Sequence, residues 1–340
     1  MTLQKELIKI LDYRNYDYEI INELDQIQHK ILLKKYSVSI FFKIKRLIKK
    51  ILYLFINFIF KKNLILVESR KLDTVEDKYE KIAGSYIEIY LNSEKKTYLC
   101  DFGYGKKVFK LKGNSKNYTT SYLSNILKKT NSKSFMEIGA GELTNFLDIY
   151  KKSGNNFRRM IALDLSFNRL FKGKKFLEDN KFKLDYYLCG NAEKIPLSDD
   201  SVDLSYSVHC LEQVPHLAEK IVKEMIRVSK NYIVLIEPSF QFGSIATKNK
   251  IFKKGYIRLS DIFFKKFNAN IIYRNIDRLS SYTNSAEIII LEKANKKNNG
   301  DKFEFICPDC KNILELDKNK LFCKHDNSIY DKKNGIFIFN

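Results

Sequence analysis

The stretch KSFMEIGAGELTNFLDIY, residues 133–150, combines an apolar run, a turn with two glycines and a helical pattern. Gly139 and Gly141 let the backbone pass close to a ligand, and the first turn of the following helix offers free amide donors. Two glycines in a strand-to-helix turn are common, so this stretch alone is a weak indication of a binding site. Thr144 stands where the fingerprint G-x-G-x-x-G needs its third glycine, which argues against a nicotinamide dehydrogenase.

The segments after this turn alternate between short apolar runs and helical patterns up to about residue 292. Such alternation predicts a doubly wound α/β domain with a largely parallel sheet. A second apolar run, RMIALDL, contains Asp164 about 20 residues after the glycine turn, which is the spacing of an acid that holds ribose hydroxyls. The sequence therefore predicts a nucleoside site at the ends of the first two strands.

Residues 189–239 add CGNAEKIPLSDDSVDLSYSVHCLEQVPH and a further helix and strand. Together with the glycine turn and Asp164, they resemble the class I S-adenosylmethionine-dependent methyltransferases, particularly the branch that acts on small molecules, lipids and glycans. In that branch an acid-x-Gly-x-Gly turn and a ribose acid precede D-A-x-x-L-P-F, F-D-x-V and L-E-H-V segments. The resemblance covers about residues 120–293 and implies a Rossmann-like, seven-stranded domain that AEIIILEKA (286–294) closes with an antiparallel strand.

The resemblance implies S-adenosylmethionine as the cofactor and gives roles to individual residues. The glycine turn would cradle the methionine part, Asp164 the ribose, and Leu165 and the Asn191 loop the adenine. This chain has Asn191 where the family has Asp, and Gln213 where a histidine is common. The expected cofactor-binding residues are Glu137, Gly139, Ala140, Gly141, Asp164, Leu165, Asn191, Ala192, Ser207 and His209.

Methyl transfer from a sulfonium is an in-line displacement that positioning alone can accelerate. A general base matters mainly when the acceptor is a hydroxyl. The candidates for such a base are, in this order, His209, Glu212 and His216. For His209, however, we favour a structural role at the end of a strand.

The insertion at 240–261 is basic and contains KKGYIR. In this fold, additions at that point shape the acceptor pocket. The expected contacts to an anionic acceptor are Lys253, Lys254, Tyr256 and Arg258, and a solvated loop is the equal alternative.

Absent motifs narrow the acceptor further. No (N/D)-P-P-(Y/F) motif follows the fourth strand and no cysteine follows a proline, so methylation of a base amine or of cytosine C5 is disfavoured. We therefore expect a methyltransferase for a small-molecule, lipid-linked or surface-glycan acceptor. The alternatives are an RNA-modifying methyltransferase and a non-catalytic scaffold.

The N-terminal third has another character. Residues 1–67 predict helices, and 68–118 predict a small β-meander with SYIEIYL, KTYLCDF and KKVFKLK as strands. The segment SIFFKIKRLIKKILYLFINFIFKK (39–62) is a basic amphipathic helix with an aromatic and aliphatic face. Its uncharged run is too short to span a bilayer, so the helix either lies on an anionic membrane surface or packs on the protein's own core.

The net charge of +21 raises the question of nucleic-acid binding. Residues 135–240 hold 15 Lys+Arg against 15 Asp+Glu, so the excess lies in the flanks. A composition rich in Lys, Ile and Asn is typical of an AT-rich genome and needs no nucleic-acid partner. The charged opening of the chain contains no secretory leader, and we expect a cytoplasmic protein that is peripheral to the inner membrane face if the helix binds lipid. The oligomeric state is not indicated.

A separate module, 303–340, is expected after the methyltransferase domain (119–294) and a polar linker. It contains ICPDCKNILELDKNKLFCKHD, with the cysteine spacing of a zinc ribbon. The module is similar to small zinc-ribbon methyltransferase activator subunits, although the fourth cysteine is missing. Three thiolates with His325 or Asp326 would complete a tetrahedral site, and we favour His325 narrowly. The expected zinc ligands are Cys307, Cys310, Cys323 and His325, with Asp326 as the alternative.

Overall fold

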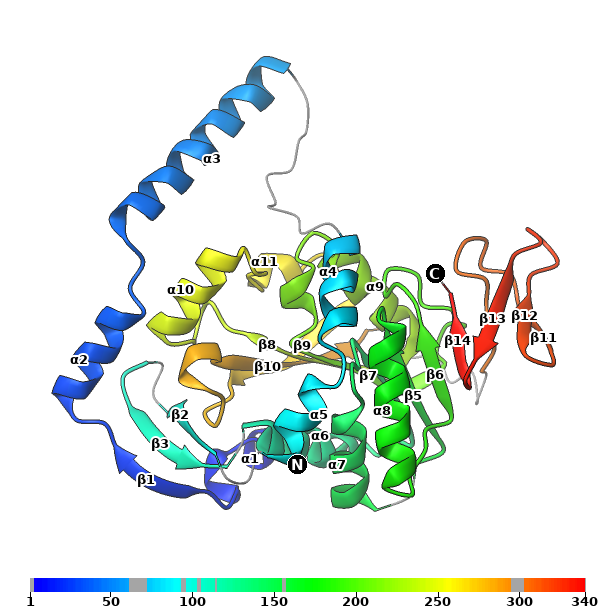
Figure 1. Ribbon diagram of the computed structural model, residues 1–340, viewed down its shortest axis with the longest axis horizontal. Helices are drawn as coiled ribbons and strands as arrows, with labels where there is room; N and C mark the ends of the chain where they lie inside the picture. Colours follow the sequence, from blue (N-terminus) through cyan, green and yellow to red (C-terminus); the bar gives the residue numbers. More distant parts are fainter. Residues whose placement is uncertain are drawn as a thin grey trace.

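The computed structural model describes residues 3–60, 72–92, 96–102, 105–113, 115–154, 157–294 and 303–339. Within these residues an 11-stranded sheet runs through the molecule (Figure 1). Its central part has the order β6-β5-β4-β7-β8-β10-β9, in which β4 to β8 are parallel and β10 is antiparallel to both neighbours. These strands are β4 (Ser134–Ile138), β5 (Arg159–Asp164), β6 (Tyr186–Cys189), β7 (Val202–Val208), β8 (Ser229–Pro238), β9 (Ala269–Ile276) and β10 (Ala286–Lys293).

Helices cover both faces of this sheet, as the doubly wound prediction requires. Neighbouring strand residues point to opposite faces, so Phe135 packs in one hydrophobic cluster and Met136 in the other. The first cluster lies against α6 to α8, and the second lies against α9. The predicted Rossmann-like α/β class is confirmed. These helices are α6 (Ser115–Lys129), α7 (Thr144–Ser153), α8 (Phe167–Asp179) and α9 (Ala218–Val228), and α10 (Ile245–Lys254) and α11 (Asp261–Phe264) follow β8.

The N-terminal region differs from its prediction in one strand. KTYLCDF and KKVFKLK do form β2 (Thr97–Asp101) and β3 (Val108–Lys112), which pair with each other. The third strand is β1 (Glu19–Glu23), which pairs with β3 and comes from the region predicted to be helical. SYIEIYL is instead the helix α5 (Ser85–Leu91). In a segment of seven residues with so many apolar positions, the pattern fits a strand as well as a helix, and tertiary packing selects one of the two. As a helix, the segment donates Ile87 N–H to Glu142 (2.8 Å) and Tyr90 O–H to Asp148 (2.5 Å).

Three further N-terminal helices surround the domain: α1 (Leu3–Ile10), α2 (Gln26–Lys35) and α4 (Leu72–Lys81). Helix α1 packs on α6 and buries Leu7 completely. Helix α4 packs on α8, next to α5. The N-terminal region is therefore part of the walls around the catalytic domain.

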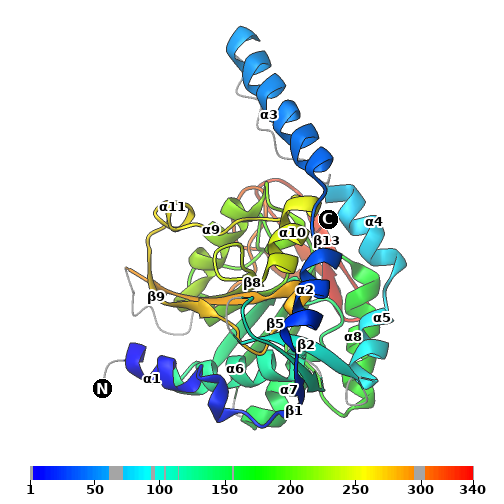
Figure 2. The same ribbon diagram turned by 90° about the vertical axis from the view of Figure 1, so that its left-hand side faces the viewer.

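The predicted amphipathic helix is α3 (Ile40–Phe60), which projects from the rest of the molecule (Figures 1 and 2). Its described side chains end at Leu52, and residues 61–62 of the predicted span lie outside the described residues. At its base, Phe42 and Arg46 contact the ring of Phe252 on α10, at 6.0 Å and 4.3 Å. Most of its apolar face, however, is open, including Phe41 (81% exposed).

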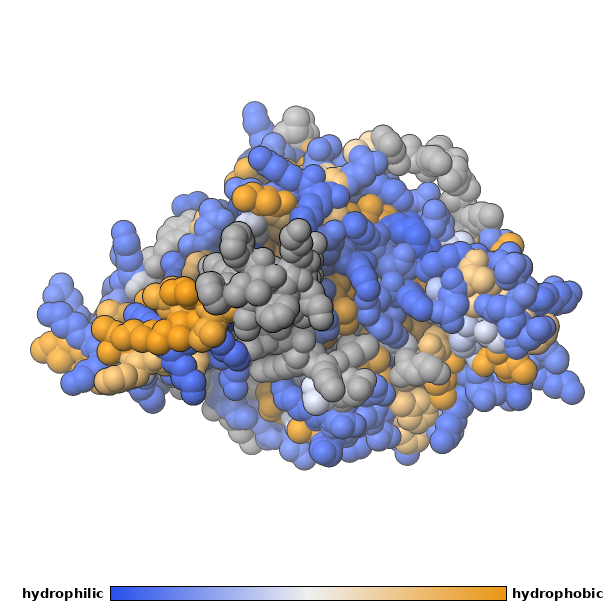
Figure 3. All heavy atoms as spheres, turned by 90° about the horizontal axis from the view of Figure 1, so that it is seen from above, coloured by the Kyte–Doolittle hydropathy of each residue, from blue (hydrophilic) through white to orange (hydrophobic). Residues whose placement is uncertain are grey.

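That open face forms an elongated hydrophobic patch in the view from above (Figure 3). Packing on the protein's own core, one of the two alternatives for this helix, is not what its described residues do. None of the described helices is long and apolar enough to cross a membrane. The exposed apolar side chains of the patch are Ile40, Phe41, Ile44, Leu47, Ile48, Ile51 and Leu52.

The C-terminal module extends the central sheet. Strand β14 pairs in parallel with β6, placing Phe337 opposite Leu188. Cys307, Leu321 and Phe337 belong to the same hydrophobic cluster as α9. The module adds β11 (Glu315–Asp317), β12 (Lys320–Phe322), β13 (Ile329–Lys333) and β14 (Ile336–Ile338). The predicted linker, residues 292–302, lies largely outside the described residues, and residues 292 and 293 belong to β10.

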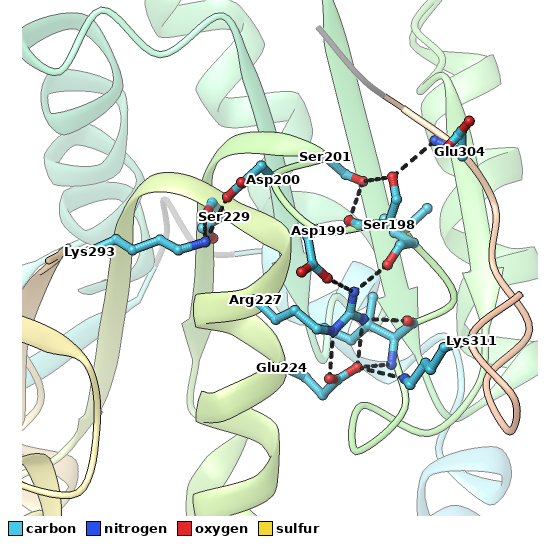
Figure 4. A network of polar contacts seen from close by, with 12 residues as sticks. Ser198, Asp199, Asp200, Ser201, Glu224, Arg227, Ser229, Lys293, Glu304 and Lys311 are labelled. Atoms are coloured by element: carbon cyan, nitrogen blue, oxygen red, sulfur yellow. Dashed lines mark hydrogen bonds and ion pairs between the residues drawn. The ribbon is translucent and has the colours of Figure 1, made fainter. Parts of the chain in front are cut away.

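A polar network strengthens this junction (Figure 4). Arg227 of α9 donates to the carbonyl oxygens of Leu197 and Ile195 and pairs with Glu224. Lys311 of the C-terminal module also pairs with Glu224, at 3.4 Å. The module is therefore attached to the domain through backbone, apolar and charged contacts together.

Candidate functional site

A pocket of about 420 Å³ opens at the carboxyl ends of the central parallel strands, where α/β sheets bind ligands. We distinguish two parts of it. The Asp164 half is lined by Gly139, Leu163, Asp164, Leu165, Ser166, Arg169, Gly190, Asn191 and Ala192. The His209 half includes Tyr79, His209, Glu212, Gln213, Lys250, Tyr256 and Asn284.

The glycine turn is shaped by close packing. Gly139 and Gly141 have φ of +71° and +55°, a region that strains other residues. A Cβ on Gly139 would lie 2.5 Å from Cys210 Sγ, and one on Gly141 would collide with the guanidinium of Arg169. Both positions therefore require glycine, and Gly139 brings bare backbone to the pocket wall.

Asp164 ends β5 with its carboxylate held by two backbone amides. Its Oδ2 accepts the N–H of Gly141 at 2.7 Å, and its Oδ1 accepts the N–H of Ser166 at 2.9 Å. The side chain is buried yet lines the pocket, and each oxygen retains a free lone pair. This carboxylate is suited to accept hydrogen bonds from the two hydroxyls of a ribose.

The predicted cofactor residues divide between the pocket and its outer wall. Gly139, Asp164, Leu165, Asn191, Ala192 and His209 line the pocket, whereas Glu137, Ala140, Gly141 and Ser207 do not. The carboxylate of Glu137 is completely buried and accepts hydrogen bonds from Asn145 (2.6 Å) and Tyr206 (3.0 Å). Burial raises the pKa of Glu137 to about 7. Glu137 thus joins α7 to β7 behind the glycine turn.

Arg169 is a pocket residue that the sequence did not indicate. Its guanidinium lies 4.8 Å from the ring centres of both Tyr79 and Tyr86, on α4 and α5. It also pairs with Glu142 (3.6 Å) and Asp164 (3.8 Å). Because Tyr79 and Tyr86 come from a helical region with no motif, only the folded structure reveals this closure of the Asp164 half.

The turn after β7 is organised by Glu237, which the sequence also did not single out. His209 begins the turn with a φ of +54°. The fully buried carboxylate of Glu237 accepts the N–H groups of Cys210, Leu211 and Glu212 at 3.0–3.2 Å. Burial raises the pKa of Glu237 to about 7. Glu237 fixes the direction in which His209 and Glu212 face the pocket.

His209 and Glu212 form a pair at the pocket wall, with Nδ1 and Oε2 3.6 Å apart. Glu212 Oε1 accepts a hydrogen bond from Gln213 (2.7 Å), but its buried Oε2 has no hydrogen-bond partner within the described part of the chain. Burial acts to lower the pKa of His209, but Glu212 and Glu237 outweigh it, so the pKa is raised. The pair therefore combines an unsatisfied carboxylate oxygen with an imidazole that titrates above its ordinary range.

Two residues missed by sequence reasoning complete the His209 half. Lys250 donates to Asn284 Oδ1 at 2.6 Å, which turns the amide nitrogen of Asn284 towards His209 Nδ1 at 3.2 Å. Tyr256, which was predicted as an acceptor contact, lines the pocket with its hydroxyl 3.5 Å from Gln213 Nε2. These groups come from segments separated by tens of residues.

The remaining predicted acceptor and base residues lie elsewhere. His216 does not line the pocket, and its buried Nδ1 has no hydrogen-bond partner in the described residues. Arg258 is exposed and stacks on Phe240 at 4.4 Å. Lys254 lines a second hollow that shares Lys250 with the pocket. Of the four residues expected to contact the acceptor, the structure brings one, Tyr256, to the pocket itself.

In the C-terminal module two loops have the same backbone pattern. Cys307 O accepts the N–H of Lys311 and Cys323 O that of Asn327, and both donors have φ near +60°. Because the loops superpose position by position, Asp326 occupies the place in the second loop that Cys310 has in the first. The ligand atoms of Cys307, Cys310, Cys323 and Asp326 all lie within 4.8 Å of one another.

His325, which we favoured narrowly as the fourth zinc ligand, does not belong to this cluster. Its side chain is exposed, because the residue two positions after the first ligand points outward from such a loop. Asp326 Oδ2 instead lies 3.0 Å from Cys307 Sγ, and the Sγ atoms of Cys310 and Cys323 are 3.4 Å apart. Three thiols and a carboxylate at these separations form a donor set that suits Zn²⁺.

Comparison with known proteins agrees with this geometry. Residues 136–235 match the family described as "Methyltransferase domain", and no curated protein matches the sequence. Similar solved structures include magnesium protoporphyrin IX methyltransferase from Synechocystis PCC 6803 with bound SAH (9% identity, 53% of this chain, 84% of that chain, TM-score 0.43). Another is the [4+2]-cyclase SpnF (10% identity, 65% of this chain, 96% of that chain, TM-score 0.46). A third is a SAM-dependent methyltransferase from Aquifex aeolicus (13% identity, 52% of this chain, 97% of that chain, TM-score 0.38). The domain that contains residues 136–235 is that of a class I S-adenosylmethionine-dependent methyltransferase.

Proposed function

We propose that the protein methylates a hydroxyl group of a small-molecule, lipid-linked or glycan acceptor that enters the His209 half of the pocket. The observation that carries this proposal is the Oε2 of Glu212, a buried acceptor atom of a pocket-lining residue that has no hydrogen-bond partner in the described structure. A buried carboxylate oxygen in that condition is costly unless a ligand donates to it. A substrate hydroxyl is such a donor.

The Asp164 half fits the cofactor. Asp164 would accept hydrogen bonds from the ribose hydroxyls, and Gly139 would present bare backbone to the chain that joins ribose to sulfur. Leu165 and the Asn191–Ala192 turn would pack against the adenine. When bound, S-adenosylmethionine supplies an electrophilic methyl group, whose transfer to an acceptor oxygen yields a thioether and releases the hydroxyl proton.

Glu212 would take that proton through Oε2. We assign this role to Glu212 and not to His209, since the Nδ1 of His209 already faces the amide nitrogen of Asn284. His209 would act as a positioning residue that orients the carboxylate through the pair of His209 Nδ1 and Glu212 Oε2. The acceptor oxygen must also lie in line with the methyl–sulfur bond, which is where positioning by the pocket contributes most.

Incubation of the purified protein with methyl-labelled S-adenosylmethionine and cell extract tests the proposal. We expect label in a lipid, glycan or small-molecule fraction. Label confined to RNA would instead support the alternative that the basic flanks serve nucleic acid. Absence of both cofactor binding and labelled product would point to a non-catalytic scaffold.

Helix α3 supports a membrane-bound location for the reaction. Its open apolar face is flanked by Lys43, Lys45 and Lys49, an arrangement suited to an anionic lipid surface. Membrane binding can be measured by co-sedimentation with vesicles of roughly 70% phosphatidylcholine and 30% phosphatidylserine, a composition that carries about the charge of a cytoplasmic leaflet. The double substitution Ile44→Asp/Ile48→Asp should weaken binding to these vesicles about tenfold or more. Ile27→Asp/Ile31→Asp, two exposed isoleucines of α2, is the matched control and should bind normally. Equal binding by both double variants would refute the membrane role.

The four-ligand cluster of the C-terminal module supports a structural zinc site. Metal analysis of the purified chain should find about one zinc per molecule. Asp326→Ala should lose most of it and Asp326→Cys should retain it, whereas His325→Ala should be indistinguishable from the wild type. Loss of zinc from His325→Ala alone would restore the original choice of ligand.

A further inference from the structure

A second hollow, of about 170 Å³, is lined mainly by one face of α10. Lys250, Lys253 and Lys254 all line it, together with Asn249 and Thr283, and no Asp or Glu is among its described lining residues. Three lysines around one hollow, with no acid among its described lining residues, favour an anionic ligand there.

Lys250 connects this hollow to the pocket. It lines both cavities, and its donation to Asn284 links it to the surroundings of His209. A molecule whose acceptor hydroxyl reaches Glu212 would therefore pass Lys250 on its way to the hollow.

Other cations add to the positive charge around α10. Burial lowers the pKa of Lys250, Lys254 lowers it further, and Glu212 acts in the opposite direction. Partial desolvation of the guanidinium also lowers the pKa of Arg258, with a further contribution from Arg46 of α3. Because Arg46 and Phe42 also contact Phe252 on α10, the hollow lies near the base of the projecting helix.

We propose that the methyl acceptor carries a phosphate or diphosphate group that binds to Lys250, Lys253 and Lys254 in this hollow. The inference rests on the proposed function, because it specifies the class of its acceptor. Lysines serve phosphate groups as compact charges with several donors, and charge-assisted hydrogen bonds of this kind are strong. A lipid-linked sugar diphosphate and a soluble sugar phosphate offer the same chemistry.

Binding of inorganic diphosphate to the full chain, measured by calorimetry, tests the site without any methyl transfer. The Lys253→Gln/Lys254→Gln variant should weaken binding about tenfold or more. Lys248→Gln changes the same charge on the same helix but lines neither cavity, and it should bind as the wild type does. No binding by the wild type, or equal binding by the double variant, would overturn the proposal.

The labelled products of the extract experiment test the acceptor class. We expect the labelled product to bear phosphate, and we expect the double variant to raise the KM for the acceptor while retaining cofactor affinity. Label in a solvent-extractable diphosphate indicates the lipid-linked source, and label in a water-soluble phosphate indicates the free one. A labelled product without phosphate would overturn this inference and leave the methyltransferase function intact. Diphosphate binding that depends on the lysines, without any labelled product, would contradict the proposed transfer and leave the anion site intact.

Discussion

The two halves of the pocket are assembled in different ways. The Asp164 half is formed by turns that directly follow β4, β5 and β6, and much of its shape comes from backbone, glycine and one carboxylate. The His209 half draws on side chains from α4, β7, α10 and the loop before β10. A ligand shared by a whole family can be bound by local motifs, whereas an individual acceptor needs side chains collected from across the chain. The comparison predicts that variants in the two halves fail differently.

The largest effect should come from Glu212→Gln. The substitution keeps shape and removes the proton acceptor, which is worth roughly 10²- to 10⁴-fold in kcat. Affinity for S-adenosylmethionine, measured by calorimetry, should stay within about threefold of the wild-type value, because Glu212 lies in the other half of the pocket and the two sites act independently. Glu219→Gln, an exposed glutamate of α9, is the control. A variant that loses cofactor affinity in parallel with kcat would show that the two halves are not separable.

Asp164→Asn should produce the opposite pattern. Replacing a charged acceptor of ribose hydroxyls by a neutral amide should weaken cofactor binding by roughly 10- to 100-fold. At saturating cofactor, kcat should recover substantially. Asp179→Asn, an exposed position of α8, controls for charge alone. If the cofactor binds Asp164→Asn normally, the carboxylate serves only to hold Gly141 and Ser166.

The smallest effect concerns the shape of the pH profile. Protonated His209 pairs with Glu212 Oε2 and competes with the acceptor hydroxyl for that oxygen, so kcat/KM should rise with pH through the pKa of His209. Since Glu212 and Glu237 outweigh burial and raise that pKa, the midpoint should lie above the ordinary value of about 6.5. His209→Gln should abolish this rise in kcat/KM while the rate at higher pH changes little. A rise that persists in His209→Gln would be due to the titration of another group.

The sequence was sufficient for the features that short-range rules determine. The alternation of apolar runs with helical patterns predicted the doubly wound domain, and the spacing from the glycine turn to Asp164 predicted a site at the ends of the first two strands. It failed where tertiary packing chose between local options, as when SYIEIYL became helical to place Tyr90 on Asp148.

The pocket residues that were missed share a physical reason. Arg169 lies in the pocket because Tyr79 and Tyr86 enclose it, and Lys250 because Asn284 accepts its proton. Each depends on a partner many residues away, so no local pattern could indicate it. His325 lies outside the cluster of candidate ligands for another reason: the correspondence of the two cysteine loops is a property of their hydrogen bonds, which residue type alone does not reveal.

The pairing of β14 with β6 also bears on how this sheet avoids joining other sheets. Without the C-terminal module, β6 would be an edge strand of the parallel sheet with a row of unpaired backbone amides and carbonyls. Such an edge can pair with a strand of another molecule and lead to aggregation. The module moves that rim outward to β11, which is three residues long, fully exposed and flanked by the charges of Glu315 and Asp317. A short, charged strand is a poor template for further pairing. The appended module thus ends the sheet in a form that resists growth.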